Sequence, residues 1–367
     1  MAEPFTPVPV PPAKTLLVPA ALGVVHFLVD ASSNFVMARL LRVCAPADLV
    51  LLLVAYNFLA FALQPLVGLA ADRLRAPRAV MCAGLLLTAA AMLALDQALW
   101  LPVLLTGLGN ALFHVGGGTI ASLATWGRAS GPGLFIAPGA IGVVVGAAAG
   151  RSVPAALWPI FLGLLAAALL GARVRASGPP STEVARLASA PPAGGKWVLV
   201  LLLLAIAGRS LLGARVGGQL TLQFGIAFPL AVAAFSGKAL GGLIGDRVGW
   251  KRTAVSSMML ACVLLLAGPH NAWAATFGML CFQVVTAITL AALYRVLPTR
   301  VALVFGCASL ALFVGSLPVL LGFDLAGFAP VPVDSLLALL TTIAVWRALA
   351  RVDRLGASVA APPSAQP

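Results

Sequence analysis

Ionisable residues are rare in this chain, and several of them fall inside apolar stretches. Asp30, Arg209 and Lys238 interrupt runs of apolar residues, as do His26 and His114. On insertion scales an ionisable group inside a bilayer costs about 2.5–3.5 kcal/mol unless it is paired or faces water. Such groups mark the paths of ions and solutes, so these five residues are the first candidates for chemistry.

Asp30 is the acidic residue that lies well inside an apolar run, which makes it the candidate proton carrier. His26 lies four positions earlier, and this spacing puts both side chains on one face of a helix. Arg209 falls about 18 Å into its own run and Asp30 about 21 Å into the first, at 1.5 Å per residue. The two charges are therefore expected at comparable depth.

The elements that carry these residues are membrane-spanning helices. The chain has 367 residues, 61% of them hydrophobic and 9% charged, with a mean hydropathy of +1.07. Apolar runs near 20 residues recur along its length, as in a helical membrane protein. We predict an all-α protein with twelve spans, at 16–41, 48–71, 79–95, 99–124, 131–150, 153–174, 197–216, 222–245, 252–268, 272–294, 300–322 and 332–350.

A polar segment rich in Pro, Ser and Gly separates the sixth span from the seventh. It predicts a cytoplasmic linker at 175–196 between two six-helix halves, at 16–174 and 197–351. Disordered cytoplasmic tails are expected at 1–15 and 352–367.

The cations test this topology. With a cytoplasmic N-terminus, 17 of the 23 Lys and Arg residues fall on the cytoplasmic side and four on the other face. This distribution follows the positive-inside rule and explains the net charge of +13 without a nucleic-acid partner. We expect a multi-pass protein of the inner (plasma) membrane, with both termini cytoplasmic.

The sequence shows no motif typical of a metal, redox, ATP-binding or catalytic site. The five cysteines are scattered, and no spacing of Cys and His predicts a metal or redox centre. The chain has no Walker A motif, no G-x-S-x-G and a single intramembrane aspartate. We therefore expect no cofactor, no metal and no enzymatic activity, and we expect a monomer.

One charged motif occurs twice. Residues 61–78 align with 235–252, which lie 174 positions later. A segment that recurs half a chain away indicates two related halves. The motif residues are Gly68, Asp72, Arg73 and Arg78 in the first copy, and Gly242, Asp246, Arg247, Gly249, Lys251 and Arg252 in the second.

Twelve spans, a central loop and this repeated G-x-x-x-D-R-x-G-x-K-R motif resemble the major facilitator superfamily. The second copy matches the family pattern in full, whereas the first has Arg75 where glycine is usual and Pro77 where a cation is common. The resemblance implies that the motif is a cytoplasmic gate. Its aspartates, Asp72 and Asp246, would bond neighbouring helix ends and arginines in one conformation and release them in the other.

A narrower resemblance is to the fosmidomycin-resistance group of drug exporters. It rests on the stretches that begin at His26, Gln64 and Gly107, namely HFLVDASSNFVMARLL, QPLVGLAADRL and GLGNALFHVGGGTIAS. The chain departs from that group at Val115 and Gly116, where Pro-Glu is usual. It also lacks the proline usual in the antiporter motif of the fifth span, with Ala147 near its place.

The superfamily resemblance implies that spans 1, 4, 7 and 10 line a central cavity. We expect Asp30 and Arg209 to face one another there, so that a substrate competing for Arg209 favours protonation of Asp30. Asp30 and His26 are assigned to proton coupling. The substrate-binding candidates are Arg209, His114, Gln64, Lys238 and Gln283.

Plainer roles stay open for several of these residues. His26 and His114 could simply bond neighbouring helices, Arg209 could pair structurally, and Lys238 could belong to the gate. The glycines at 142, 146 and 150, and those at 237 and 241, could serve packing or a sliding surface.

The sequence predicts a secondary active transporter that works by alternating access. The cations of the expected cavity favour a small anionic or zwitterionic solute, and the resemblance favours proton-coupled export of a drug or metabolite. An importer or uniporter of an organic anion is the alternative. A membrane-embedded enzyme, or a sensor on a transporter fold, is an interpretation of another class.

Overall fold

A computed structural model describes residues 13–174, 195–267, 270–323 and 330–360, which are helical apart from turns and short connections. Eleven helices among them are long and apolar enough to cross a membrane, and α4 (Pro77–Leu93) is a shorter apolar helix. These twelve segments correspond to the twelve predicted spans. The predicted linker lies outside the described residues up to 194, and so do residues 1–12 and 361–367 of the predicted tails.

The N-terminal half begins with α1 (Ala13–Leu40). The second span combines α2 (Leu49–Asn57), a π-helical turn (Phe58–Ala62) and α3 (Gln64–Leu74). α4 and α5 (Trp100–Ala124) follow. The fifth span is divided into α6 (Ser130–Ile136) and α7 (Gly139–Ser152), and α8 (Leu157–Gly171) is the sixth.

The C-terminal half contains α10 (Gly195–Phe224), α11 (Ala227–Val248) and α12 (Trp250–Ala267). It continues with α13 (Ala272–Val296), α14 (Val301–Leu320) and α15 (Pro330–Ala360). α15 runs past residue 352, where the sequence predicted a disordered tail to begin. α1 likewise starts at Ala13, inside the predicted N-terminal tail.

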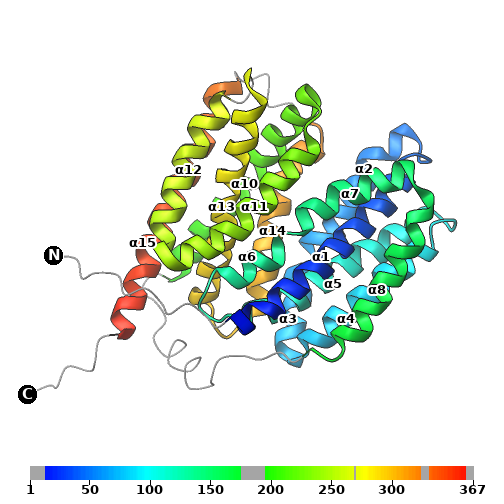
Figure 1. Cartoon of the computed structure of the whole chain (residues 1–367), viewed down its shortest axis with the longest axis horizontal. Coiled ribbons are helices and arrows are strands. Elements are labelled where there is room, and N and C mark those ends of the chain that lie inside the picture. The colour runs from blue at the N-terminus through cyan, green and yellow to red at the C-terminus, as the bar shows by residue number, and fades with distance from the viewer. Residues whose placement is uncertain (1–12, 175–194, 268–269, 324–329, 361–367) are drawn as a thin grey trace, which may run out of the picture.

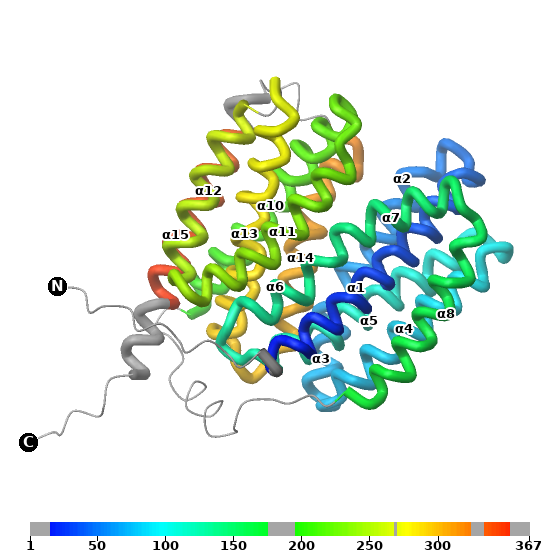
Figure 2. The backbone as a smooth tube through the Cα atoms, viewed as in Figure 1, coloured from blue at the N-terminus to red at the C-terminus, as the bar shows by residue number. Residues whose placement is uncertain are grey.

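The two halves lie side by side. In Figure 1 α1, α3, α4, α5, α7 and α8 form one bundle, and α10 to α15 form the other. The tube in Figure 2 shows α6 at the junction, beside α11 and α14. α3 packs against α14 and α11 packs against α6, so each half offers its second span to the fifth span of the other half. This exchange is the symmetry that the repeated motif predicts.

The fifth span is interrupted at Ala137 and Pro138, because proline has no N–H to continue the helical ladder. Ala140 bonds the carbonyl of Ala137 and Ile141 that of Pro138, with the tighter i to i+3 spacing. Pro138 leaves the carbonyl of Leu134, four residues earlier, without its helical donor, and the carbonyl of Phe135 in the same interrupted turn is open to a side chain. A break of this kind is tolerated in a span where neighbouring groups satisfy the freed backbone.

The glycine stripes are packing surfaces within each half. A Cβ at Gly142 or Gly146 would collide with the backbone of α1 at Phe27 or Ala31, and one at Gly241 would collide with Val284 of α13. Small residues let these helix backbones approach closely. Different glycines face the opposite half, and they belong to the gate described next.

Candidate functional site

The motif in the first half is bonded to a helix end of the second half. The carboxylate of Asp72 accepts hydrogen bonds from the backbone N–H groups of Ala302, at 3.1 Å, and Leu303, at 2.9 Å. These donors belong to the first turn of α14, where N–H groups lack helical acceptors and the helix dipole favours an anion. A Cβ at Gly68 would collide with the carbonyl of Ala302, so this glycine permits the contact.

The second copy makes the equivalent contact in the opposite direction, from the second half to the first. Asp246 accepts from the N–H groups of Ala129, at 2.8 Å, and Ser130, at 2.9 Å, where α6 begins. The indole of Trp250 adds a third bond of 2.9 Å to the same carboxylate. A Cβ at Gly242 would collide with Ala129, as one at Gly68 would with Ala302. The two carboxylates therefore join the halves at two symmetric points.

Arginines reinforce this closure without pairing with the aspartates. Arg295 donates to the carbonyl of Gly127 at 2.9 Å and lies 3.8 Å from the ring centre of Trp250. Among the described residues no arginine or lysine lies within ion-pair distance of Asp72 or Asp246. The basic residues of the motif are mostly solvent-facing: Arg73, Arg78, Arg247 and Arg252 are exposed or half-buried, and Lys251 is half-buried.

Arg75 and Gly249 occupy equivalent positions and both have positive φ. Arg75 ends α3 in the left-handed region, with φ 51° and ψ 37°, and Gly249 ends α11 with φ 106° and ψ 134°. Arg75 is the one non-glycine residue with positive φ in the described ranges. The missing glycine of the first copy therefore leaves an arginine in a conformation that glycine adopts more cheaply.

Three predicted residues of the first half meet in one buried cluster. The Nε2 atom of His26 lies 3.1 Å from Asp30 Oδ2 and 2.8 Å from His114 Nε2. Asn110 donates to Asp30 Oδ1 at 3.2 Å, and His114 Nε2 lies 3.7 Å from the same oxygen. The side chains of α1 and α5 thus place Asp30 beside two imidazoles.

Neighbouring backbone fixes both rings. His26 Nδ1 lies 2.9 Å from the carbonyl oxygen of Phe135, which the interruption of the fifth span left free. His114 Nδ1 lies 2.8 Å from the carbonyl oxygen of Asn110, one turn earlier on α5. Gly139, at the start of α7, covers the cluster so closely that a Cβ there would overlap Asp30 and His26.

The spacing of the cluster can be compared with that of a metal site and that of a hydrogen bond. Its donor atoms all lie within 4.8 Å of one another. Two nitrogens on a tetrahedral zinc ion, with Zn–N near 2.0–2.1 Å, are about 3.3 Å apart. The 2.8 Å between the Nε2 atoms of His26 and His114 is instead the length of a hydrogen bond. In this structure the two imidazoles are therefore spaced as a hydrogen-bonded pair.

The second half holds buried cations among neutral partners. The Arg209 guanidinium donates to Thr286 Oγ1 at 2.6 Å, to the Phe282 carbonyl at 3.2 Å and to Gln283 Oε1 at 3.4 Å. It also lies 5.0 Å from the ring centre of Phe282, while its Nε atom is buried without a partner. No carboxylate neutralises it among the described residues.

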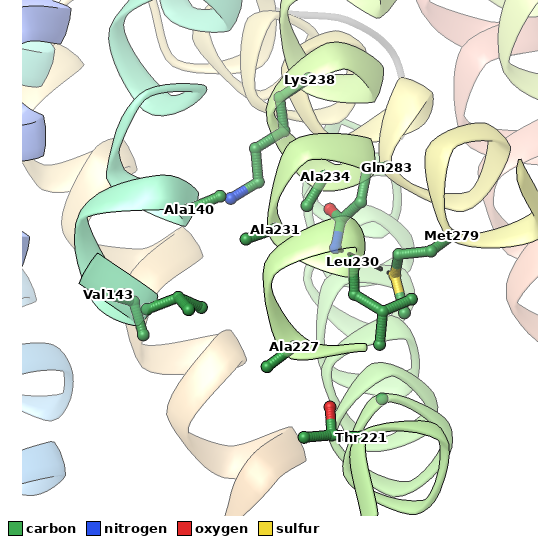
Figure 3. Close-up of a pocket in the computed structure, with 12 residues that line it drawn as sticks. Ala140, Val143, Thr221, Ala227, Leu230, Ala231, Ala234, Lys238, Met279 and Gln283 are labelled. Atoms are coloured by element: carbon green, nitrogen blue, oxygen red, sulfur yellow. Dashed lines mark hydrogen bonds between the residues drawn. The ribbon is translucent and has the colours of Figure 1, made fainter. Parts of the chain in front are cut away.

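Lys238 points into a pocket between the two halves. Figure 3 shows its side chain extending from α11 toward Ala140 of α7, with Gln283 of α13 close by. The pocket has a volume of about 320 Å³ and continues along α11 to Ala227 and along α10 to Thr221. Within the described residues the Lys238 amine has no ion-pair partner.

The pocket runs toward the end of the molecule opposite the gate. Asp246 is near the C-terminal end of α11, Lys238 lies two turns before it, and Ala227 is the first residue of that helix. The backbone of Lys238 packs against Gly133 of α6, the helix whose first turn bonds Asp246. Lys238 thus contacts the gate helix with its backbone and the pocket with its side chain.

The expected pair of Asp30 and Arg209 is not formed in this structure. Asp30 bonds within the first half, to His26 and Asn110, whereas Arg209 bonds within the second half. Comparable depth did not bring them together, because each side chain finds partners on the helices of its own bundle.

Of the predicted substrate-binding residues, Lys238 and Gln283 line the pocket, whereas Arg209, Gln64 and His114 do not. Arg209 reaches the lining through its bond to Gln283. Gln64 is fully buried after the π-helical turn and donates to the carbonyl of Ala60 at 2.7 Å. Sequence reasoning did not single out Thr286, which makes the shortest bond to Arg209. Its position three residues after Gln283, on the same helix face, is the signal that could have found it.

Structural comparison identifies the fold. The chain is similar to a variant of the E. coli fucose:proton symporter FucP, with 15% identity and a TM-score of 0.64, over 92% of this chain and 98% of that one. It is also similar to the human organic anion transporter MFSD10 (TETRAN), with 16% identity and a TM-score of 0.68, over 92% and 100% of the two chains. The chain has the major facilitator fold.

A third solved structure, FucP in the outward conformation, matches with 13% identity and a TM-score of 0.62, over 92% of this chain and 99% of that one. No protein-family model and no curated protein sequence matches this sequence. At these low identities the similarity shows the fold, so the function is argued from the site itself.

Proposed function

We propose that the protein is a secondary active transporter that moves a small organic anion, or a zwitterion with a negative end, by alternating access. The observation that carries this proposal is a pair of buried cations, Lys238 in the lining of the pocket and Arg209 bonded to the lining residue Gln283. Neither has a carboxylate partner among the described residues. An unpaired cation in a bilayer is costly, and an anionic ligand would offset that cost. One structural neighbour is an organic anion transporter.

The two gate contacts correspond to one end state of such a cycle. Asp72 and Asp246 close the side that the positive-inside rule assigns to the cytoplasm, and the pocket extends toward the opposite end of α11. We propose that this is the outward-facing state, and that release of both carboxylates opens the cytoplasmic side. The match to a transporter in the outward conformation supports this assignment.

Proton coupling is proposed to reside in the cluster of the first half. Asp30 and His26 can exchange protons, and an electrostatic interaction links Asp30 with Lys238 on the other side of the interface. An anion bound at Lys238 would weaken this attraction and favour a proton in the cluster. This linkage binds the anion and the proton together, as proton symport requires, without a direct contact between Asp30 and Arg209. Antiport requires instead that the anion and the proton bind in alternation.

Export is the preferred direction, and it would make the protein an efflux antiporter of the inner membrane that could serve drug resistance. It follows the resemblance to the fosmidomycin-resistance exporters. Proton symport of an organic anion is the second candidate, because one neighbour is a proton symporter. The two candidates differ in the direction of proton movement, since an antiporter moves protons against the direction of its substrate and a symporter moves them with it.

Proteoliposomes loaded with a pH-sensitive dye provide the test. We expect methylphosphonate or a short carboxylate such as succinate to drive proton movement, and the cation tetraphenylphosphonium to have no effect. Proton movement with the cation alone would contradict the proposed anion site. Absence of proton movement with every member of the panel, together with measurable solute uptake, would indicate a uniporter.

Asp30→Asn tests the coupling in the same vesicles. We expect exchange of labelled solute across the membrane to continue, because the pocket is unchanged, and proton movement to be lost. Full proton-driven transport by this variant would refute the coupling scheme. Asp334→Asn is the matched control, because Asp334 pairs with Arg215 at 2.9 Å, within the second half.

A further inference from the structure

The two histidines of the cluster are oriented so that their remaining nitrogens face each other. A backbone carbonyl can only accept a hydrogen bond, so the Nδ1 atoms of His26 and His114 must both be the N–H donors to Phe135 and Asn110. A neutral imidazole protonated at Nδ1 has a lone pair at Nε2. Two neutral rings would therefore bring two lone pairs together at 2.8 Å.

We infer that one proton is held between the Nε2 atoms of His26 and His114, with the Asp30 carboxylate as its counter-ion. One ring is then an imidazolium that donates an N–H···N hydrogen bond to the other ring. The positive charge is balanced by Asp30, which lies 3.1 Å from His26 Nε2. The cluster is neutral as a whole, which is the least costly state in the low-dielectric interior.

A proton on the carboxyl group does not account for this geometry. A protonated Asp30 could donate to His26 Nε2, but the lone pair of His114 Nε2 would still lie 2.8 Å from the same nitrogen. The shared proton satisfies both rings and leaves Asp30 free to accept from Asn110, at 3.2 Å. His114 therefore belongs to the proton site, and not to the substrate site that the sequence predicts for it.

The surroundings add few other charges. The titratable groups that interact electrostatically with the cluster from other helices are Tyr56 of α2 and Lys238 of α11. The segments that cover it from the fifth span contribute the uncharged residues Phe135 and Gly139. Lys238 repels the shared proton, so an anion that neutralises this amine would stabilise the protonated pair.

Asp30 is the route by which the proton exchanges. Its side chain is 14% exposed, against 6% for His26 and 9% for His114, so water reaches the carboxylate before it reaches either ring. Protonation then breaks a hydronium O–H bond, forms a transient O–H bond at the carboxylate, and ends as an N–H bond at His26 Nε2, with a water molecule left behind. Deprotonation follows the same steps in reverse.

Nitrogen-15 NMR of histidine-labelled protein in lipid vesicles tests the shared proton directly. The chain has three histidines, and the third, His270, is exposed on the loop before α13. A His270→Gln variant therefore identifies its signals and leaves those of the pair. At neutral pH we expect two protonated Nδ1 signals, and two Nε2 signals that are intermediate in shift and coupled to each other through one hydrogen.

Two variants and one metal control complete the test. Asp30→Asn removes the counter-ion, and we expect the coupled Nε2 signals to be lost while the Nδ1 signals persist. In His114→Gln the remaining Nε2 of His26 should show no coupling to a second ring. Treatment with EDTA should leave the wild-type spectrum unchanged, and a spectrum altered by EDTA or restored by Zn²⁺ would overturn the inference in favour of a metal.

The spectra also overturn the inference if both Nε2 atoms are bare, or if the proton signal resides on the Asp30 carboxyl in a carbon-13 spectrum. The coupling role rests on the proposed function, whereas the shared proton does not. A wild-type protein that moves no protons in vesicles would remove the proposed coupling and leave the NMR result standing. His114→Gln with undiminished solute-driven proton movement would overturn the pair as carrier while the transporter proposal survives.

Discussion

The two halves repeat one scaffold and differ in their buried charges. In the first half Asp30 lies beside two imidazoles and can be neutralised by one proton within its own bundle. In the second half Arg209 has only neutral partners, and Lys238 faces the pocket. The proposed function divides in the same way, with proton exchange assigned to one half and anion binding to the other.

The largest effect that this division predicts comes from Arg209→Ala. Loss of a charged hydrogen-bond donor costs roughly 1.5–3 kcal/mol, so anion affinity should fall by about 10- to 100-fold. Titration calorimetry with the anion that proves active in vesicles measures this change. Arg215→Ala is the control, since Arg215 is also buried on α10 but is paired with Asp334. Equal losses of affinity in both variants would contradict a specific anion site at Arg209.

The two gate contacts should differ in strength, and the expected effect is smaller than that of Arg209→Ala. Asp246 accepts three hydrogen bonds and Asp72 two, so Asp246→Asn should open the gated side more than Asp72→Asn. Loss of a capping carboxylate costs about 1–2 kcal/mol, which shifts the populations of two states by roughly 5- to 30-fold.

Spin labels at the exposed positions Arg78 and Arg252 would report this opening by pulsed distance measurements, in a background that lacks the native cysteines. We expect a longer distance component that is larger in Asp246→Asn than in Asp72→Asn. An unchanged distance distribution in both variants would show that the aspartates do not hold the gate closed.

The smallest predicted effects concern the turn after each aspartate. Arg75→Gly should raise the free energy of unfolding by about 0.5–1 kcal/mol, because glycine tolerates the left-handed conformation better than arginine. Gly249→Ala should lower it by about 1–3 kcal/mol, because φ 106° with ψ 134° is a region nearly restricted to glycine. Thermal unfolding in detergent measures both, and changes of the same sign would contradict this difference between the copies.

Much of the fold could be predicted from the sequence. The apolar runs specify the twelve spans, and the repeated motif identifies the two carboxylates that join the halves. The hydrogen-bond acceptor of each gate contact can also be predicted, since an aspartate at the end of an apolar span stands out in the sequence. The donors were not predictable, because Ala302, Leu303, Ala129 and Ser130 contribute only backbone N–H groups.

The candidate site could be predicted only in part. The four-residue spacing of His26 and Asp30 places them together on any helix, and the structure confirms this contact. The approach of His114 depends on how α1 packs against α5, which no local pattern encodes. Asp30 and Arg209, which were expected to face one another, form no ion pair in this structure, and depth along a helix does not specify which neighbour a side chain meets.

The hydrogen-bond donors of the gate are backbone N–H groups, and this affects how the sequence can diverge in evolution. Because Asp72 and Asp246 bond to amide groups, the donated bond does not depend on the side-chain chemistry at Ala302, Leu303, Ala129 or Ser130. The burial of Ala302, Ala129 and Ser130 restricts these positions by size alone. Proline is the exception, since it has no N–H to donate. The donor half of each gate contact thus carries no side-chain signature, and two proteins of this fold could share the contact while only its aspartate is recognisable in their sequences.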